Sequence, residues 1–560
     1  MKKIIIPVIA IILIGSIVFG IASISKIPAP ESADNISQLG DFIENFKIEN
    51  KLYVIDAGTF KTREERHLAV SLQGIVGKKA PLIFIITNGM DRQYLEKISE
   101  SGIELIYNDK NGKPWIIATL LREFKAYIGD NGYTLYKESE KGEGLNIATN
   151  LATLYSWLPV HQSLQTLAED IGLELKEDLT DDEYNVALQK AFFEQNKEMF
   201  NRNAVVSLRY EPTGLRDLAI QQGYYVFYID EDEDGDKFRG KVLDFVGDNA
   251  AVLGWAKHEK WYVKQCSRKG DFVIPSDFSH NNSFLASFDY EKLEQKHQKT
   301  KEYTDTTKHY CALVFSDGDN VQWIQNGYSE YYQKLALEKQ FPITWSFSPF
   351  MQEFSPVTTN MVYSSATEND YFIAGVSGAG YINPTKYPLE ALEGYTDLTA
   401  AVMSKSDLSY VSILDSTPKS FISDKIMEHR LGYYARYDNI KGGVLSLDPD
   451  RYEGGKGKVY FANDKPFVSN RLSLWHPDGE GANVTKEWLK EQAEMVNSYP
   501  ADIESINGYS VINIHPWTVS VENLSYFVSQ LDENVELVTL DELLTMVEKN
   551  IPHKTASPTS

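Results

Sequence analysis

Cysteine is scarce in this 560-residue sequence, which contains only Cys266 and Cys311. Two cysteines exclude a fold built on a disulfide framework, and they exclude a metal cluster bound by several thiolates. Cys311 lies within an apolar segment that is typical of a buried strand, so we expect an inert thiol there. Whether the two residues form a disulfide stays open, because the export signal described below would permit one.

Basic residues are also in the minority. Lysine and arginine total 55 against 79 aspartate and glutamate residues, which gives a formal net charge of -24. This acidity disfavours nucleic acid or an anionic membrane surface as the main partner. A neutral polymer is a better match, and the aromatic residues, 12% of the chain, supply flat faces that can stack on sugar rings. We therefore expect no nucleic acid. Composition leaves two alternatives open for the aromatic residues, a carbohydrate partner and a structural role, because tyrosine-rich cores and surfaces also occur in proteins that do not bind sugar.

The amino terminus has the layout of a secretory signal. Two lysines precede an apolar run over residues 4–24, and small residues near its end suit a cleavage site. The run approaches the roughly 20 residues that span a bilayer, so residues 1–25 fit either a cleaved signal peptide or a retained membrane anchor. A linker over residues 26–46 follows. We expect an exported protein, secreted or at the cell surface, with any membrane attachment through this segment only.

The remaining chain is too long for one hydrophobic core, and its pattern changes along its length. Strand and helix patterns alternate over residues 47–110 and again over 201–300, which predicts two small α/β subdomains, the latter ending in a charged connector. The segment between them, residues 111–200, is mainly helical in pattern. Residues 301–552 form the largest unit, a candidate catalytic domain, and a short tail over 553–560 follows.

The C-terminal unit has the rhythm of a (β/α) barrel, because helical patterns separate most of its strands. Seven or eight strands predict an α/β, barrel-like domain, complete or distorted. An open nucleotide-binding sheet is disfavoured, since no glycine-rich phosphate turn follows an early strand. The candidate strands cover residues 310–315, 343–347, 371–375, 410–414, 443–447, 467–470, 510–514 and 535–538.

Polar residues follow many of these strands, where the loops of such a barrel converge. Asp317 and Asp319 flank a glycine directly after one strand, and such a pair can share a proton or hold a cation. The same segment equally suits a turn that caps the next helix. His515 ends a late strand and is a candidate general acid/base or metal ligand. The candidate catalytic residues are Asp317, Asp319, Asp370, Asp415 and His515.

Three further places are candidates for substrate binding. Gly378 and Gly380 lie one residue apart, so the backbone there can turn sharply and approach a ligand closely, with the Tyr381 phenol beside them. Trp517 follows the last of the catalytic candidates and offers a platform for a sugar ring.

Arg209 and Glu211 form the third place. They follow a strand of the third N-terminal unit, and we expect their loop to border the same cleft as the acids. They also suit a surface ion pair.

The segment over residues 377–384 resembles the signature of the GxGYxYP glycoside hydrolases, a family of bacterial proteins with a multi-part N-terminal region and a C-terminal barrel-type domain. Asn383 replaces the second tyrosine of that signature, so a role for that phenol in ligand binding is not carried over. Other segments that look like pieces of the family cover residues 71–74, 315–320, 345–349, 369–372 and 515–517.

The resemblance implies action on sugars, and the residues support three hypotheses. The first is hydrolysis of a glycosidic bond by two of the four candidate aspartates, whose separation determines retention or inversion. The second is a metal-dependent carbohydrate esterase or deacetylase, with Asp317, Asp319 and His515 around the metal. The third is a non-catalytic glycan-binding surface protein, in which Trp323, Tyr381 and Trp517 stack on sugar.

Polysaccharide deacetylases show a secondary likeness to this pattern, with paired acids after an early strand and a histidine after a late one. Their metal-binding histidine pair has no counterpart here, because His429 and His476 lack the required close spacing. We therefore expect the first hypothesis and no cofactor, although a divalent cation is possible under the second.

Overall fold

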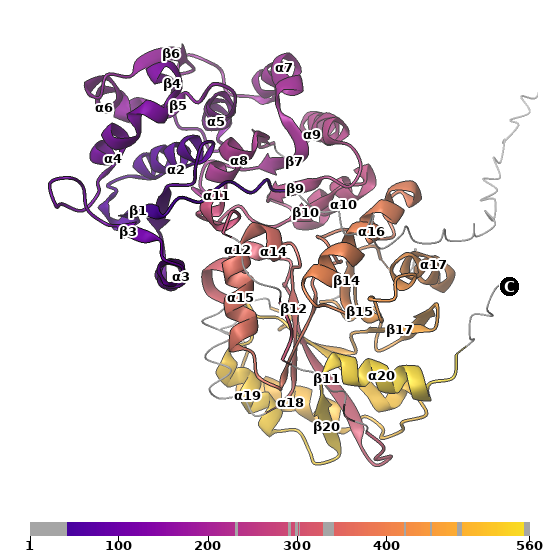
Figure 1. Cartoon of the computed structure of the whole chain (residues 1–560). Helices are drawn as coiled ribbons and strands as arrows, with labels where there is room; N and C mark the ends of the chain where they lie inside the picture. The colour runs from indigo at the N-terminus through magenta and orange to yellow at the C-terminus, as the bar shows by residue number, and fades with distance from the viewer. Residues whose placement is uncertain are drawn as a thin grey trace, which may run out of the picture.

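The computed structural model describes residues 42–229, 233–288, 293–296, 301, 303–328, 341–418, 422–448, 451–478 and 484–553. The predicted export segment, most of the linker and nearly all of the tail lie outside these residues. Three N-terminal units, indigo to magenta in Figure 1, lie above the C-terminal unit, which runs from salmon to yellow. Within the described residues, none of the helices combines the length and apolar character needed to cross a bilayer.

The first unit is a parallel sheet with helices beside it. Helix α2 begins directly after Thr62, whose hydroxyl caps it by accepting a hydrogen bond from the Glu65 amide at 3.2 Å. The sheet has the order β2–β1–β3, and the elements are β1 (Lys51–Asp56), α2 (Arg63–Gly77), β2 (Ile83–Ile86), α3 (Gly89–Glu100) and β3 (Glu104–Ile106).

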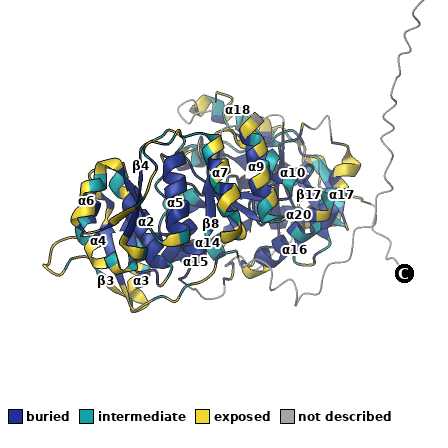
Figure 2. Cartoon of the chain, turned by 90° about the horizontal axis from the view of Figure 1, so that it is seen from above, coloured by how far each residue is buried: buried dark blue, intermediate teal, exposed yellow. Residues whose placement is uncertain are grey.

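The second unit contains a three-stranded parallel sheet in addition to its helices, with the order β5–β4–β6. The sequence pattern did not reveal it, since β6 is largely exposed and carries little apolar periodicity. Helix α5 is buried over most of its length, whereas α6 lies exposed at the edge (Figure 2). The elements are α4 (Ile117–Phe124), β4 (Gly132–Tyr136), α5 (Glu143–Tyr155), β5 (Leu158–His161), α6 (Gln165–Asp170), β6 (Glu174–Asp178) and α7 (Val186–Asn196).

The third unit is a four-stranded parallel sheet in the order β10–β9–β7–β8. Strands β8, β9 and β10 are fully buried apolar runs, and β7 is buried from Ala204 onwards, as expected for a parallel sheet covered on both faces. The elements are β7 (Asn201–Ser207), α8 (Arg216–Gln222), β8 (Tyr224–Phe227), α9 (Glu233–Val246), β9 (Ala251–Gly254), α10 (Glu259–Lys269), β10 (Phe272–Ile274) and α11 (Asn282–Leu285).

The C-terminal unit is a ten-stranded sheet that is curled into a half-barrel. Its order is β16–β17–β15–β14–β13–β12–β11–β19–β18, with β20 also beside β11, and all pairs except β16–β17 are parallel. Among the described strands, no pairing joins β17 to β18. The strands are β11 (His309–Phe315), β12 (Ile343–Phe347), β13 (Asp370–Ala374), β14 (Val411–Asp415), β15 (Gly443–Leu447), β16 (Val459–Ala462), β17 (Lys465–Ser469), β18 (Leu472–Leu474), β19 (Tyr509–Ile514) and β20 (Val535–Val538).

All eight predicted strands are present in this sheet, and the sequence pattern missed only the short β16 and β18 among those described. The prediction of an α/β unit is therefore confirmed; the observed sheet is a curled half-barrel, and the predicted (β/α) barrel type stays a prediction. The helices that accompany the strands are α12 (Val321–Trp323), α14 (Met351–Phe354), α15 (Pro356–Ser365), α16 (Leu389–Lys405), α17 (Asp424–Ala435), α18 (Lys486–Asn497), α19 (Val521–Ser529) and α20 (Leu540–Asn550).

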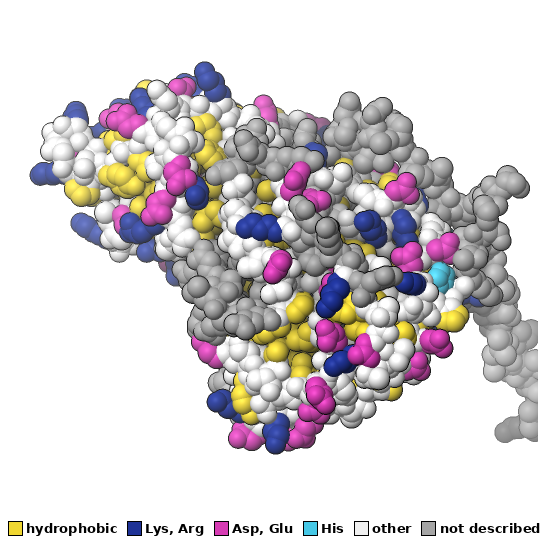
Figure 3. All heavy atoms as spheres, turned by 60° about the horizontal axis from the view of Figure 1, so that its bottom comes forward, with side chains coloured by type: hydrophobic (Ala, Val, Ile, Leu, Met, Phe, Trp, Pro, Cys, Tyr) yellow, Lys and Arg dark blue, Asp and Glu magenta, His cyan; other side chains and the backbone are white. Residues whose placement is uncertain are grey.

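One hydrophobic core continues from the third unit into the C-terminal unit. Phe272 on β10 contacts Tyr395 on α16 with ring centroids 5.9 Å apart, and it also contacts Phe350 beyond β12. Both cysteines are free and fully buried, and burial raises the pKa of each thiol. On the face shown in Figure 3, acidic and basic side chains are interspersed over the C-terminal unit.

Candidate active site

A cavity of about 70 Å³ lies where the carboxyl ends of the C-terminal strands face the third unit. Asp317 and Asp319, which follow β11, line it together with Leu414 near the end of β14. The opposite wall includes Glu259, the first residue of α10, and Tyr381 from the loop after β13. The cavity therefore combines carboxyl groups from two separate units.

A tight turn after β11 presents the first two acids. A side chain at Gly318 would place its Cβ 2.2 Å from the Ser346 backbone on β12, so only glycine fits between the acids. Asp317 has a φ of 62°, in the left-handed region that few non-glycine residues adopt. Asn320 caps the next helix, because its side-chain oxygen accepts the Trp323 amide at 3.2 Å. The predicted capping turn and the paired acids thus coexist.

Asp319 is the more deeply buried of the two acids. Burial raises the pKa of its carboxyl well above the usual range, and the nearby charges of Asp317 and Glu259 raise it further. These effects favour the protonated form. A buried carboxyl that keeps its proton can act as a general acid.

Asp317 lies in a more polar setting. Its carboxylate accepts hydrogen bonds from the Ser316 hydroxyl at 2.5 Å and from the indole nitrogen of Trp517 at 3.3 Å. His515 Nε2 is 3.9 Å from Asp317 Oδ2. Asp317 therefore has two hydrogen-bond donors and an imidazole at its side, while 22% of its side chain remains exposed.

His515 is held in place by its neighbours. Its ring stacks on Trp475 with centroids 4.0 Å apart and planes 2° apart, and Nδ1 lies 3.2 Å from the Thr518 hydroxyl. Burial lowers the pKa of His515, and the charge of Asp317 partly opposes this. Trp517 is 51% exposed, close to the acids, with its ring 5.7 Å from that of Trp323. The structure thus brings His515 and Trp517 to Asp317.

Glu259 was not predicted from the sequence. The Tyr381 hydroxyl donates a hydrogen bond to its carboxylate at 3.0 Å. Burial raises the pKa of Glu259, and the charge of Asp317 adds to the effect. The adjacent Lys260 forms an ion pair at 2.9 Å with Asp448, which follows β15. In the sequence, Glu259 is indistinguishable from the acids that commonly begin helices.

Comparison with known proteins supplies the family. Residues 307–548 match the GxGYxYP putative glycoside hydrolase C-terminal domain, and residues 203–287 match the GxGYxYP third domain. The chain belongs to the GxGYxYP family. The two matches cover both units that contribute carboxyl groups to the cavity. No functionally curated protein matches the chain.

A solved structure shares the fold of this GxGYxYP protein. It is a putative hydrolase from Bacteroides thetaiotaomicron VPI-5482, with a TM-score of 0.81 at 23% sequence identity, covering 92% of this chain and 98% of that one. A putative polysaccharide deacetylase from Mycobacterium smegmatis gives a TM-score of 0.31 at 11% identity, over 48% of this chain and 100% of that one. The second likeness is too low to support an argument.

The glycines of the GxGYxYP signature pack against protein. At Gly378, where φ is 121°, a Cβ would lie 2.5 Å from the Thr399 side chain on α16. At Gly380, a Cβ would lie 2.4 Å from the Phe272 ring on β10. The predicted close approach to a ligand is therefore an approach to α16 and to the third unit, and neither glycine lines the cavity.

Tyr381 is the signature residue that reaches the cavity. Its backbone pairs with Val273 of β10 through two hydrogen bonds of 2.9 and 3.0 Å. Asn383, in place of the second signature tyrosine, is buried, and its side-chain oxygen accepts hydrogen bonds from the Ser416 amide and hydroxyl. The signature loop thus joins the C-terminal unit to the third unit while it positions one phenol.

Two predicted acids do not reach the cavity. Asp370 is the first residue of β13, at the opposite edge of the sheet, where it accepts hydrogen bonds from Trp345 Nε1 at 2.8 Å and from Thr367. Asp415 ends β14 at the expected edge, but its carboxylate accepts hydrogen bonds from Thr385 and Thr417. Neither lines the cavity.

Arg209 and Glu211 lie elsewhere. Their exposed side chains form an ion pair at 3.3 Å and line a separate hollow of about 750 Å³ with Glu138 and Lys141 of the second unit. The surface-pair interpretation therefore describes them better than a place in the acid-lined cavity. Within the described part of the chain, His, Cys, Asp and Glu side chains form no group of three or more arranged to hold a metal ion.

Proposed function

We propose that this protein is a glycoside hydrolase that acts on a neutral oligosaccharide or polysaccharide through carboxyl groups. The observation that carries the proposal is the meeting of Asp317, Asp319 and Glu259 in one cavity. Two of these carboxyls have raised pKa values, whereas Asp317 is surrounded by hydrogen-bond donors. A glycosidase pairs one carboxyl that gives a proton with a second carboxyl that acts at the anomeric carbon.

In the proposed reaction, Asp319 donates its proton to the glycosidic oxygen as the bond to the anomeric carbon breaks. Asp317 acts at the anomeric carbon, either directly as a nucleophile or as a base that takes a proton from the attacking water. His515 and Trp517 hold the Asp317 carboxylate in position. Membership of the GxGYxYP family supports action on a carbohydrate.

Glu259 is the second candidate for the acid. Its carboxyl also has a raised pKa, but the Tyr381 hydroxyl already binds it and holds it to the wall. We assign it to orientation of the sugar and, through its charge, to raising the pKa of Asp319. If Glu259 were the acid, Glu259→Gln would reduce turnover as strongly as Asp319→Asn.

The rim supports a neutral glycan as substrate. The exposed Trp517 indole offers an apolar face beside the acids, with Trp323 next to it. A sugar ring placed on this face would have its rim hydroxyls near Asp317. The acidic net charge disfavours polyanionic glycans.

The test is release of product from a panel of neutral oligosaccharides and aryl glycosides, followed by chromatography. We expect the wild-type chain to cleave at least one of them, and we expect Asp319→Asn to cleave the oligosaccharides more slowly by about 10²-fold or more. Activity should persist in a chelator. Release of acetate that stops with the chelator would favour a metal-dependent deacetylase, and binding without any product would favour a glycan-binding protein.

We also propose that the protein is exported through residues 4–24, which lie outside the described residues. The support is the lysine-flanked apolar run in the sequence. N-terminal sequencing of the mature protein in its native host tests this. A new amino terminus near residue 25 would indicate cleavage, whereas an intact Met1 with membrane fractionation would indicate an anchor.

A further inference from the structure

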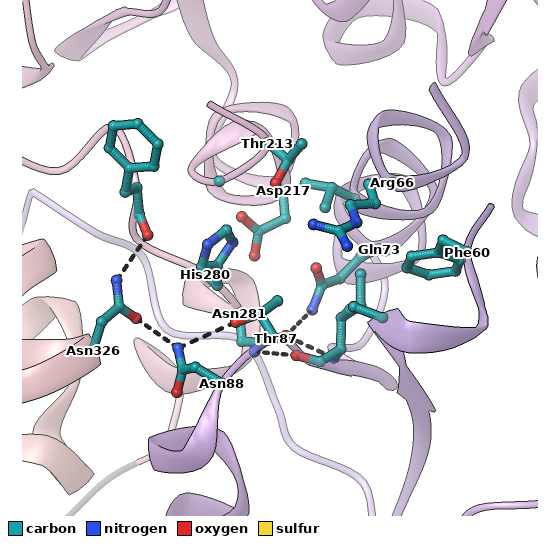
Figure 4. A pocket seen from close by; sticks show the side chains of 15 residues that line it. Phe60, Arg66, Gln73, Thr87, Asn88, Thr213, Asp217, His280, Asn281 and Asn326 are labelled. Atoms are coloured by element: carbon teal, nitrogen blue, oxygen red, sulfur yellow. Dashed lines mark hydrogen bonds between the residues drawn. The ribbon is translucent and has the colours of Figure 1, made fainter. Parts of the chain in front are cut away.

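A second cavity, of about 280 Å³, lies among the first unit, the third unit and the segment that follows the two acids. Figure 4 shows its side chains converging from α2, from α8 and from the loop after β10. It shares no lining residue with the acid-lined cavity. It is therefore a separate hollow, and it requires its own explanation.

Asp217 on α8 provides the strongest sign of a ligand. Its side chain is fully buried, and one oxygen accepts a hydrogen bond from the Ser283 amide at 2.8 Å. The other oxygen, Oδ1, is buried without a partner among the described residues. In Figure 4 the carboxyl group points into the space between His280 and Arg66. An unpaired buried polar atom is costly, so the site lacks a hydrogen-bond partner that a ligand would supply.

The floor of the cavity is fixed by amide side chains. Gln73 on α2 donates to the Asn281 side-chain oxygen at 2.9 Å, and Asn281 donates in turn to the Ile85 carbonyl at 2.9 Å. A Cβ at Gly74 would lie 2.7 Å from the Asp217 carbonyl, so glycine allows α2 to approach α8 here. Gln73 and Gly74 belong to the 71–74 segment that resembles the family. This segment therefore helps to form the floor of the cavity.

The rim joins three parts of the chain. Asn326 donates to the Phe278 carbonyl at 3.0 Å, and its side-chain oxygen accepts a hydrogen bond from Asn88 at 3.1 Å. Asn326 lies on the π-helical segment Ile324–Tyr328, which follows the acid-bearing turn. A ligand at this rim would touch the same segment that leads from the two acids.

The chemistry of the lining indicates the class of ligand. Phe60 and Phe278 supply apolar faces, while Asp217 accepts a hydrogen bond and the amides can donate or accept. The Arg66 guanidinium beside the carboxyl disfavours a cationic ligand, whereas burial lowers the pKa of His280 to about 4, so that its imidazole adds no positive charge near neutral pH. The cavity volume of about 280 Å³ lies just below the range of roughly 300–1,000 Å³ found for sites that bind drug-sized molecules. A cavity of this volume suits one small ring. A ring with apolar faces and hydroxyl groups at its edge has these properties.

We infer that this cavity binds one neutral sugar residue, at a site distinct from the acid-lined cavity. A hydroxyl group of the sugar donates to Asp217 Oδ1, and an aromatic side chain of the lining contacts an apolar face of the ring. This site would hold a second part of a glycan, or a released sugar, next to the segment that follows Asp319. The inference concerns binding and does not require that the acids hydrolyse the sugar.

The experiment is calorimetric titration of the full-length protein with glucose, galactose, mannose and xylose. Glucosamine and inorganic phosphate serve as cationic and anionic probes. We expect a neutral sugar to bind equally well to the wild-type chain and to Asp319→Asn, which keeps this test independent of hydrolysis. Binding should be at least tenfold weaker in Asp217→Asn and in Thr213→Phe, which fills the cavity from a half-buried loop.

Glu211→Gln is the matched control, because it changes an exposed acid in the separate hollow and should leave the affinity unchanged. If Asp217→Asn fails to fold, as judged by circular dichroism, Thr213→Phe decides. The inference is overturned if no neutral sugar binds the wild-type chain, if only glucosamine or phosphate binds, or if the folded variants bind with wild-type affinity.

Discussion

At the scale of single residues, the surroundings of each carboxyl separate the candidate acids. Asp319 and Asp370 are both buried, but Asp370 is surrounded by donors at the amino end of β13 while Asp319 lines the cavity. The predicted strand over residues 371–375 already left Asp370 at its amino end, whereas Asp319 follows the carboxyl end of its strand, so this was the sequence signal that could have separated the two acids.

This difference gives a prediction. Asp370→Asn should leave kcat/KM within a few fold of wild type and lower stability by about 1–3 kcal/mol, since it weakens the bonds to Trp345 and Thr367. Asp319→Asn should do the reverse and reduce kcat strongly while the fold persists. Kinetics and thermal melting of the two variants check this. Equal loss of activity in both would place the chemistry elsewhere.

The buried carboxyl of Asp319 also makes stability depend on pH. Its pKa is raised in the folded state, so its contribution is fully present below the unfolded pKa near 4 and is lost as pH rises through the folded value. Asparagine does not titrate. We therefore expect the melting temperature of Asp319→Asn, relative to wild type, to increase between pH 4 and pH 8. A constant difference over that range would contradict the raised pKa.

At the scale of elements, the signature loop serves to join two units. Gly380 leaves no space for a side chain against the Phe272 ring. In contrast, the nearest contact of a Cβ at Gly240, in the middle of α9, would be the Lys269 side chain at 3.6 Å. The sequence revealed the conformational freedom of the signature glycines but not what they approach, because Phe272 lies more than a hundred residues earlier in the chain.

Alanine substitutions test this role. Gly380→Ala should destabilise the protein by about 1–3 kcal/mol through overpacking. Gly240→Ala, the matched control, should stabilise it by about 0.5–1 kcal/mol, because alanine is the better residue within a helix. Chemical denaturation measures both. A neutral Gly380→Ala would show that the loop has room and that its glycines have another purpose.

At the scale of the whole molecule, the third and C-terminal units share a core and should unfold together. Calorimetry of wild type and Phe272→Ala tests this, because Phe272 lies on β10 and contacts Tyr395 of the C-terminal unit. The substitution should cost about 3–5 kcal/mol and lower the main transition as a whole. Movement of a small separate peak alone would mean that the units unfold independently.

The packing of the whole molecule also explains which features the sequence predicted and which it missed. Strong apolar periodicity identified all eight main strands of the C-terminal sheet, and the strand ends located Asp317, Asp319 and His515 at one edge. Glu259 was missed because its position depends on how the third unit packs onto that edge. Such packing is decided by contacts between distant segments, and local pattern does not encode it. The second cavity, formed by three separate parts of the chain, was hidden for the same reason.

The central claim is that Asp319 donates the proton to a departing sugar. The most direct test compares kcat/KM of wild type and Asp319→Asn on two glycosides of the same sugar, one with a nitrophenyl leaving group and one with an alkyl or sugar leaving group. A general acid matters most when the leaving group is basic. The account predicts a loss of about 10²–10⁴-fold for the poor leaving group and a much smaller loss for nitrophenol. Equal losses on the two substrates would contradict it.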